Sequence, residues 1–480
     1  MLFSDPIFLF CFLPIVLTLH SLLPTQWRNI VLLAASLFFY AWGEGAHMLV
    51  MLVSIGINYR LGVKLAAAGN ERSRRFLMKL AIAFNLGMLV VFKYTNFLFV
   101  SAVGACGIEL AEKYTPSIHL PIGISFFTFQ ALSYVIDVYR RQVEPQQRLG
   151  DLALYIASFP QLIAGPIVRY SDVQKQIAKR IVNFHQFRHG IERFIVGLGK
   201  KMIIANAAAE IADAAFALNA HQLSSGDAWI GAFAYAIQIY FDFSGYSDMA
   251  IGIGLMLGFR FAENFNYPYI AMSVTEFWRR WHISLSTWFR DYLYIPLGGN
   301  RQGQVRTYVN LMIVFLLCGL WHGASWTFVL WGALHGMFLI VERIGFSRVL
   351  NRLGLLAHTY TMLTVLFAWV LFRADTVSQA AAFMQAMLGV AGNWQLHHSV
   401  NLVMTRYHVT VLCIAVAAAT PIGPLAVDRL RQLIEKKPRL GEVLRPTFEL
   451  TQLAGISLQF AWCVCLVFSS TYNPFIYFRF

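Results

Sequence analysis

The chain carries little charge for its length. Asp, Glu, Lys and Arg make up only 13% of its 480 residues, about half of the roughly 25% found in an average soluble domain. No polar block of soluble-domain size and no Pro/Ser-rich linker interrupts the sequence. These absences exclude an ordinary soluble enzyme and predict a single membrane domain over residues 1–480.

Signatures of several enzyme classes are also missing. There is no G-x-x-x-x-G-K-[ST] loop, no G-x-S-x-G elbow and no H-E-x-x-H helix, which argues against known NTPase, serine-hydrolase and zinc-protease mechanisms. The six cysteines lie mostly inside apolar runs without metal-ligand spacing, so we expect packing residues and no metal site. No basic n-region precedes the first apolar run, so we expect a retained span.

What the sequence has in abundance is apolar length. It is 58% hydrophobic, with a mean hydropathy of +0.57. Crossing a bilayer takes about 20 residues, and interruptions by Gly and Pro make roughly 10 to 13 membrane segments the best estimate. The apolar runs are residues 7–23, 29–42, 48–63, 77–100, 121–139, 152–167, 194–218, 229–257, 308–320, 326–341, 360–372, 409–421 and 453–468. The fold class is therefore predicted to be all-α and multi-pass.

The net charge of +14 is spread over short loops between these runs. That distribution is typical of the positive-inside rule and not of nucleic-acid binding. Loops 60–79, 169–201 and 429–445 are the best candidates for the cytoplasmic side. In the simplest interpretation these basic residues face water and only set the orientation of the chain in the membrane. They could also attract a donor that carries phosphate groups.

The stretch SVTEFWRRWHISLSTWFRDYLYIPLGGNR, residues 273–301, is predicted to be an amphipathic helix of about 20 residues. Ser273 with Glu276 matches a capping box, and Pro296 with Gly298-Gly299 supplies a stop. At 100° per residue, five polar residues fall within about 80° of one another: Thr275, Arg279, His282, Ser286 and Arg290. The helix either lies in the membrane interface or enters a protein cavity, and the alternative is a surface anchor whose histidine is incidental.

The stretch CGLWHGASWTFVLWGALHG, residues 318–336, holds two histidines in an apolar setting. His322 stands at the break between two apolar runs, where an ionisable group predicts a functional site. A neutral imidazole suits general-base work on a hydroxyl. His335 lies 13 residues further on, about 220° round a continuous helix, so we interpret it as a packing residue.

The stretch YFDFSGYSDMAIG, residues 240–252, places Asp242 and Asp248 in or near a span. The Ser-Gly-Tyr-Ser between them could unwind the helix there. The two carboxylates are either part of a site wall or of an internally hydrogen-bonded helix break, and the sequence leaves both open.

Residues 276–301 and 318–336 resemble the signature regions of the bacterial branch of the membrane-bound O-acyltransferase superfamily. The similarity extends in order through LPIGISFFTFQALSYVIDVYR, FPQLIAGPIVRY, YFDFSGYSDMAIGIGLMLGFRFAENFNYPY, FAWVLFRAD and the terminal NPFIYFRF. It covers most of the chain. The resemblance implies a ring of tilted transmembrane helices around a thinned membrane centre, crossed by a central tunnel.

The family's catalytic histidine corresponds to His322 and its second signature histidine to His282, whereas His335 is not carried over. We add six substrate-tunnel candidates: Trp321, Arg279, Ser286, Arg290, Asp242 and Asp248. Teichoic-acid D-alanylation relatives share the two histidines, so the motifs specify the reaction type better than the acceptor.

The resemblance implies an inner-membrane acetyltransferase with no bound cofactor. Its donor would be acetyl-CoA or another acyl thioester on the cytoplasmic side. Its acceptors would be hydroxyls of an exported polysaccharide, alginate first and cellulose second, reached through a periplasmic SGNH-hydrolase-like acetyltransferase. Membrane lipids would surround it.

Two other classes remain open at the level of sequence. A transporter or flippase would also be multi-pass and could use Asp242 and Asp248 as coupling carboxylates. A non-catalytic scaffold of a polysaccharide-secretion complex would tolerate the loss of His322. The aromatic, nearly uncharged tail, residues 473–480, is predicted to pack against the protein or a partner.

Overall fold

The computed structural model describes residues 1–106, 118–390, 394–436, 438–469, 472–474 and 476, and for residues 435 and 438–443 the backbone alone. Every regular element in these ranges is helical. The residues form two compact units, Met1–Ile191 with Ala250–Ala262, and Glu192–Met249 with Glu263–Phe480. Helices α10 (Phe184–Gly199) and α12 (Ser225–Met256) contribute residues to both.

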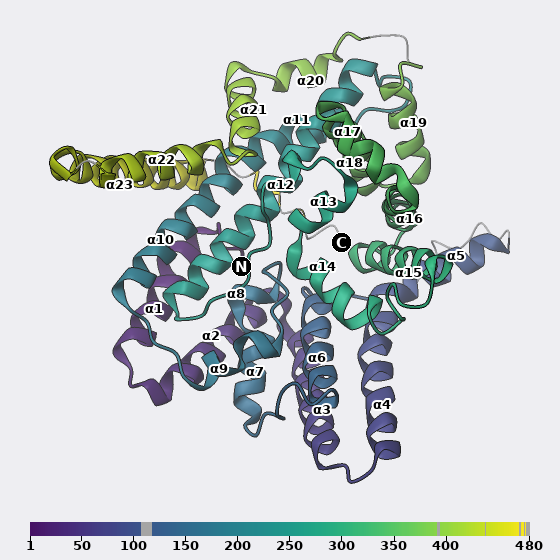
Figure 1. Cartoon of the computed structure of the whole chain (residues 1–480), viewed down its shortest axis with the longest axis vertical. Helices are drawn as coiled ribbons and strands as arrows, with labels where there is room; N and C mark the ends of the chain where they lie inside the picture. The colour runs from purple at the N-terminus through teal and green to yellow at the C-terminus, as the bar shows by residue number, and fades with distance from the viewer. Residues whose placement is uncertain (107–117, 391–393, 437, 470–471, 475, 477–480) are drawn as a thin grey trace. The chain divides into compact units, whose positions relative to one another are not determined.

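The first unit is built from helices that pack side by side, and α3, α4 and α6 form its most regular group (Figure 1). Asn58 on α3 and Asn85 on α4 exchange two side-chain hydrogen bonds of 3.1 and 2.8 Å, a polar contact that suits helices inside a membrane. The elements are η1 (Phe8–Phe12), α1 (Leu13–Leu22), α2 (Thr25–Glu44), η2 (Gly45–His47), α3 (Met48–Ala67), α4 (Glu71–Leu89), η3 (Val90–Tyr94), α5 (Thr95–Ala105), α6 (Ile124–Tyr139), α7 (Leu149–Ala157), α8 (Phe159–Leu162) and α9 (Tyr170–Ala178).

The second unit contains both segments that the sequence singled out. Helices α15 (Gln304–His322) and α16 (Trp326–Val341) form its tightest pair. The backbone is extended at Gly323, which ends α15 shortly before α16 begins. The remaining elements are η4 (Lys200–Ala205), α11 (Asn206–Phe216), η5 (Pro268–Ile270), α13 (Val274–Arg280), α14 (Ile283–Phe289), η6 (Arg290–Tyr294), η7 (Glu342–Phe346), α17 (Ser347–Leu353), α18 (Leu355–Arg373), α19 (Val377–Met387), α20 (His398–Val403), α21 (Arg406–Ala418), α22 (Ile422–Lys436) and α23 (Pro438–Ser469).

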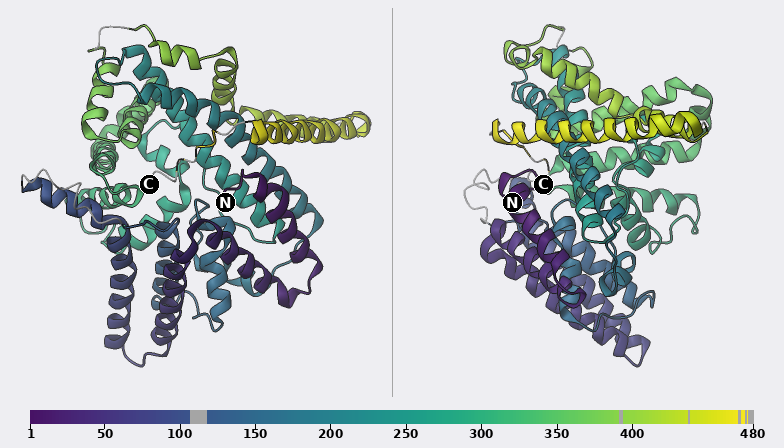
Figure 2. Two further views of the ribbon diagram at one scale, coloured as in Figure 1. Left: turned by 180° about the vertical axis from the view of Figure 1, so that it is seen from behind. Right: turned by 90° about the vertical axis from the view of Figure 1, so that its left-hand side faces the viewer.

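The two yellow helices, α22 and α23, lie side by side (Figure 2). Along α23, Leu450, Leu453, Leu458, Trp462 and Phe468 are all exposed. A row of exposed apolar side chains on a long helix is what lipid contact requires.

Six helical stretches among the described residues are long and apolar enough to cross a membrane, or seven if the bent pair α21 and α22 forms one span. The protein is therefore a multi-pass membrane protein. The sequence predicted 10 to 13 membrane segments because it counted every apolar run, and several of these runs form shorter or broken helices in the structure. The run 152–167, for example, is interrupted after α7 at Ser158 and again after α8. The six stretches are Thr25–Ala67, Glu71–Ala105, Gln304–His322, Trp326–Leu353, Leu355–Arg373 and Leu444–Ser469.

Candidate functional site

His282 and His322 come together in the second unit, with their ring centroids 6.2 Å apart and their planes at 60°. They are 40 positions apart in the sequence and lie on different elements. Both are buried, with 0% and 5% of their surface exposed. Trp321 lies beside both, its ring 4.9 Å from that of His322 and 6.0 Å from that of His282. The two histidines that the sequence selected therefore share one site.

His322 is the last residue of α15, and aromatic rings surround it. The rings of Trp331 and Phe372 each lie 5.2 Å from the His322 ring, in edge-on contact. The cavity that His322 lines has only about 10 Å³ open to the centre of a water molecule, room for about one water. Its other walls are Ile239, Phe243, Trp281, Trp331, Trp369, Phe372 and Ile476.

The predicted single helix over residues 273–301 is wrong in one respect, because it breaks at His282. Helix α13 ends at Arg280 and α14 begins at Ile283, and His282 between them has a left-handed backbone, φ +43° and ψ +54°. The predicted start is confirmed, since Ser273 Oγ accepts a hydrogen bond of 2.9 Å from the Glu276 amide. The predicted stop is also confirmed, as η6 ends at Tyr294 and Gly298 and Gly299 form turns.

Asn264 holds the break at His282 in place. Its side-chain oxygen accepts hydrogen bonds from the Ser284 amide at 3.2 Å and the Ser284 hydroxyl at 2.9 Å, and lies 3.1 Å from His282 Nδ1. Its carbonyl oxygen accepts a hydrogen bond of 2.9 Å from the Ile283 amide. Because the side-chain oxygen can only accept, Nδ1 of His282 carries the proton and Nε2 keeps a lone pair.

His282 is therefore a neutral ring with one unused nitrogen. Its Nε2 is buried and has no hydrogen-bond partner among the described residues. Helices α13 and α14 lie outside the candidate spans, and burial lowers the pKa of His282 to about 3. Phe243 packs against the ring edge-on at 4.6 Å and also lines the His322 cavity.

The start of α13 is fixed by a buried carboxylate from another element. Glu342, at the end of α16, accepts hydrogen bonds of 2.7 and 2.9 Å from the amides of Val274 and Thr275 and one of 2.6 Å from the Thr275 hydroxyl. A negative charge at a helix N-terminus is favourable. Glu342 and Asn264 thus hold the two ends of the segment that leads to His282.

Three tunnel candidates lie on the broken segment. Arg279 and Arg290 are exposed, and Arg290 pairs with Asp291 at 2.6 Å. Ser286 is half-buried and donates to the Trp281 carbonyl at 3.4 Å. The prediction that they share a face with His282 assumed a continuous helix, and the break removes that assumption. Their proposed place along a tunnel stays a prediction.

Asp242 and Asp248 lie on α12, which is helical from Ser225 to Met256, so the Ser-Gly-Tyr-Ser stretch between them continues the helix and does not unwind it. Gly245 instead serves close packing, since a Cβ there would lie 2.7 Å from the carbonyl oxygen of Gly197. Both carboxylates are neutralised: Asp248 pairs with Arg193 at 2.7 Å and Lys200 at 2.6 Å. Neither carboxylate therefore lies at a helix break, and their proposed place in a site wall or tunnel stays a prediction.

Asp242 connects α12 to the tail of the chain. It pairs with Lys201 at 2.8 Å and accepts a hydrogen bond of 2.9 Å from the amide of Ile476. Lys201 also donates to the carbonyl of Pro474. Ile476 is buried beside His322, which agrees with the predicted packing of residues 473–480, although residues 475 and 477–480 lie outside the described part.

His335 occupies a different environment. It is fully buried on α16 and accepts a hydrogen bond of 3.2 Å from Trp278 Nε1. This contact agrees with the interpretation of His335 as a packing residue. The sequence reasoning missed Asn264 and Glu342, because no local pattern links either residue to His282.

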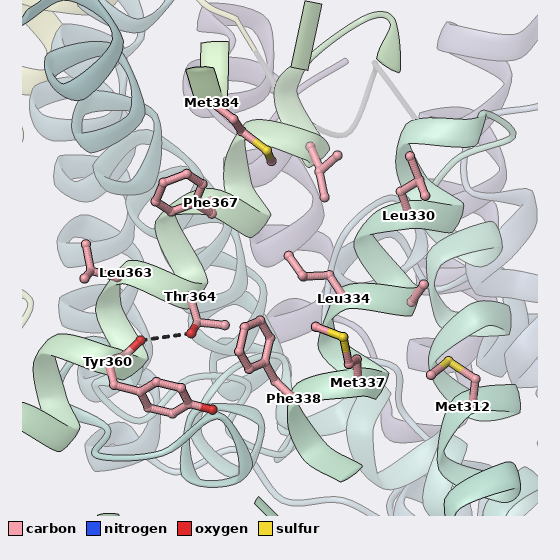
Figure 3. Close-up of a pocket in the computed structure, with 12 residues that line it drawn as sticks. Met312, Leu330, Leu334, Met337, Phe338, Tyr360, Leu363, Thr364, Phe367 and Met384 are labelled. Carbon is pink, nitrogen blue, oxygen red and sulfur yellow. Dashed lines mark hydrogen bonds between the residues drawn. The ribbon is translucent and has the colours of Figure 1, made fainter. Parts of the chain in front are cut away.

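A larger pocket of about 760 Å³ lies between α15, α16, α18 and α19. Its lining is apolar apart from Tyr360 and Thr364, and the Thr364 hydroxyl donates to the Tyr360 carbonyl at 2.9 Å (Figure 3). Neither His282 nor His322 lines it. An apolar pocket between membrane helices suits lipid chains and offers no group for acid–base chemistry.

Comparison with known proteins identifies the family of the chain. The sequence model of the membrane-bound O-acyltransferase (MBOAT) family matches residues 88–378, a range that contains both His282 and His322. The chain belongs to the membrane-bound O-acyltransferase family. It is an O-acyltransferase, as the sequence motifs predicted. The match includes residues of both compact units, and the single domain over 1–480 stays a prediction.

The chain is also similar over its full length to individual proteins of this family. The chain is 43% identical to the probable alginate O-acetylase AlgI of Pseudomonas putida and 41% identical to that of Pseudomonas aeruginosa, over 100% of each chain in both cases. It is 33% identical to a peptidoglycan O-acetyltransferase of Helicobacter pylori, over 100% of this chain and 98% of the relative.

Proposed function

We propose that this membrane-bound O-acyltransferase takes an acetyl group from a cytoplasmic thioester, acetyl-CoA first, and passes it across the bacterial inner membrane for O-acetylation of an exported polysaccharide. The observation that carries the proposal is the meeting of His282 and His322 in one buried aromatic site. Full-length similarity to proteins named as alginate O-acetylases favours alginate as the polymer, with cellulose second.

In this reaction His322 acts as the general base. It removes the proton of the attacking hydroxyl while the new O–C bond forms, the C–S bond breaks, and the thiolate leaves and is protonated. A thioester is already activated, so positioning and proton transfer suffice, and the latter contributes about 10²–10⁴-fold. The reaction needs no metal and no bound cofactor.

His282 serves as a second, neutral acceptor in the same site. Its unused Nε2 can receive a hydrogen bond from an N–H or O–H group of the thioester or of the hydroxyl that attacks it. The aromatic walls strengthen such contacts because they exclude water. The Trp321 ring lies close to both histidine rings.

The immediate acceptor in this proposal is a periplasmic SGNH-hydrolase-like acetyltransferase, which passes the acetyl group on to the polymer. An enzyme that uses acetyl-CoA must reach the cytoplasm, so the inner membrane is its location. Because the Helicobacter relative is named as a peptidoglycan O-acetyltransferase, peptidoglycan is the polymer to test beside alginate.

The test is to reconstitute the purified protein in vesicles with acetyl-CoA, the periplasmic partner and either alginate, cellulose or peptidoglycan, and to measure free CoA and polymer-bound acetate by mass spectrometry. We expect CoA release and acetate on alginate in equal amounts, both lost in His322→Ala. Movement of substrate without CoA release would favour a transporter. Acetylation that survives His322→Ala would favour a scaffold.

A further inference from the structure

Three residues of the first unit bring metal-ligand atoms together away from the two histidines described above. Glu44 is the last residue of α2, His47 ends the turn η2, and His119 precedes α6. One ligand atom from each lies within 4.8 Å of the others. No short motif revealed this set, because His119 is 72 positions beyond His47.

Backbone geometry holds the three residues at one place. Gly45 has a φ of +54°, a conformation that glycine adopts without steric cost, and it lets the chain turn sharply between α2 and α3. The Tyr40 hydroxyl on α2 donates a hydrogen bond of 3.0 Å to the carbonyl of Ile122, which ties the segment that carries His119 to α2.

The Glu44 carboxylate is buried and only partly paired. Only 1% of its side chain is exposed, and its Oε1 is buried with no hydrogen-bond partner among the described residues. It also lies at the C-terminus of α2, where the helix dipole disfavours negative charge. The one ion pair that the described residues give Glu44 is with His119, at 3.0 Å. This pair occupies Oε2 and leaves Oε1 without a donor, although a buried charged oxygen normally has a partner.

The two histidines are oriented as metal ligands usually are. Their rings lie 4.2 Å apart at 34°, and His119 Nε2 faces Glu44 Oε2. His47 Nδ1 lies 3.3 Å from the carbonyl oxygen of Glu44, a contact in which the ring donates. Metal-binding histidines commonly donate one ring N–H to a carbonyl in this way, which leaves the other nitrogen as the ligand.

We propose that Glu44, His47 and His119 bind a divalent transition-metal ion, with zinc the expected ion. Two imidazoles and one carboxylate suit zinc, whereas calcium and magnesium require mainly oxygen ligands. Zinc bonds of about 2.0–2.1 Å in a tetrahedron place ligand atoms roughly 3.4 Å apart, so the site closes with small side-chain movements. The metal replaces the proton between His119 and Glu44, and its fourth position takes water or an external anion.

The charge pattern of the chain predicts that the site lies at the face of the membrane opposite the basic residues 60–79. Helix α3 runs from Met48 to Ala67, and 20 helical residues span about 30 Å. The basic residues between positions 60 and 79, at the end of α3 and the start of α4, are expected on the cytoplasmic side by the positive-inside rule. The other end of α3, next to His47, would then face the exterior. The ion would tie the α2–α3 turn to the segment before α6.

The experiment uses the full chain, purified in detergent through a tag without histidines, stripped with a chelator and then incubated with ZnCl₂ or CoCl₂. We expect one zinc per chain by inductively coupled plasma mass spectrometry after gel filtration, and cobalt absorption bands of tetrahedral intensity. Glu44→Gln, His47→Ala and His119→Ala should each lower retained zinc at least tenfold. His221→Ala, which removes an exposed histidine elsewhere, should leave it unchanged.

Glu44→Gln keeps the size and shape of the side chain, so it separates metal binding from folding. His119 is more than half exposed, which makes its replacement the mildest of the three. Zinc retained at wild-type stoichiometry by both Glu44→Gln and His119→Ala, with normal gel filtration, would overturn the proposal. So would absence of stoichiometric zinc or cobalt in the well-folded wild type.

Discussion

At the residue scale, the candidate site combines a strained backbone with a precise hydrogen-bond acceptor. His282 is one of three non-glycine residues with positive φ among the described residues, and a left-handed backbone costs an L-residue roughly 1–2 kcal/mol. Asn264 offsets this cost by binding three groups of residues 282–284 through its side chain. Strain that neighbouring groups maintain is typical of functional positions.

Replacement of His322 tests the proposed base. His322→Ala and His322→Gln should each lower acyl transfer by at least about 10²-fold, because neither side chain can remove a proton from a hydroxyl. His335→Gln should retain most activity, since an amide can also accept the Trp278 hydrogen bond. Polymer acetate per unit of membrane protein is the measurement. An abundant His322→Gln variant with near-normal transfer would remove this residue from the mechanism.

Replacement of Asn264 tests the positioning of His282. Asn264→Ala removes the acceptor of the buried His282 Nδ1–H, at about 1–3 kcal/mol, and should lower acyl transfer at least tenfold. Asn264→Asp keeps the acceptor oxygen and adds a negative charge next to the ring, which raises the pKa of His282. This variant should therefore regain stability but show a pH–rate profile shifted from that of the wild type. An unchanged profile in Asn264→Asp would count against the proposed orientation.

At the scale of elements, the hairpin of α15 and α16 positions His322. A Cβ at Gly319 would lie 2.2 Å from the Phe328 carbonyl oxygen, and one at Gly332 would lie 2.2 Å from the Phe315 carbonyl oxygen. These contacts are with backbone atoms, which cannot move aside without shifting a helix. The two glycines therefore set the separation of the helices one turn before His322.

Gly319→Ala should push α15 and α16 apart and lower both acyl transfer and thermal stability. Gly336→Ala is the matched control, because its Cβ would meet only side-chain atoms, the nearest being the flexible Met312 sulfur at 3.1 Å. Thermal stability is measured by fluorescence-monitored melting in detergent, and acyl transfer is measured as acetate transfer by the same samples. Equal behaviour of the two variants would show that close packing at Gly319 is unimportant.

Much of this organisation was predictable from local sequence, namely the helical class, the capped start at Ser273 and the stop at Gly298. The break at His282 was not, because no Gly or Pro marks it and its hydrogen bonds come from Asn264, 18 positions earlier. The continuous α12 was also missed, since Gly245 resembles a helix breaker until its packing partner, Gly197, is known. Long-range contacts decided each of these points.

At the scale of the whole molecule, the end of the chain returns to a helix in its middle. The Ile476 amide reaches Asp242, 234 positions earlier, and Asp242 and Lys201 form a buried pair. Removing one member of such a pair typically costs about 3–5 kcal/mol. The tail therefore depends on an ion pair that also stabilises the second unit.

Truncation after Pro474 should lower acyl transfer at least tenfold while leaving the protein in the membrane, because every candidate span precedes it. Ile476→Ala keeps the amide that binds Asp242 and should have a smaller effect. Polymer acetate and membrane abundance, measured together, check both variants. Full transfer by the truncated protein would refute a role for the tail.

The small cavity beside His322 also affects how much of the thioester donor is hydrolysed without acyl transfer. With room for about one water, it excludes a thioester in this arrangement, so the base and an activated acetyl group meet only after side chains move apart. The incoming acceptor hydroxyl would then enter the enlarged space beside His322. A site of this kind would protect the proposed thioester donor from futile hydrolysis between turnovers. Consumption of acetyl-CoA without acceptor should therefore stay far below the rate of transfer.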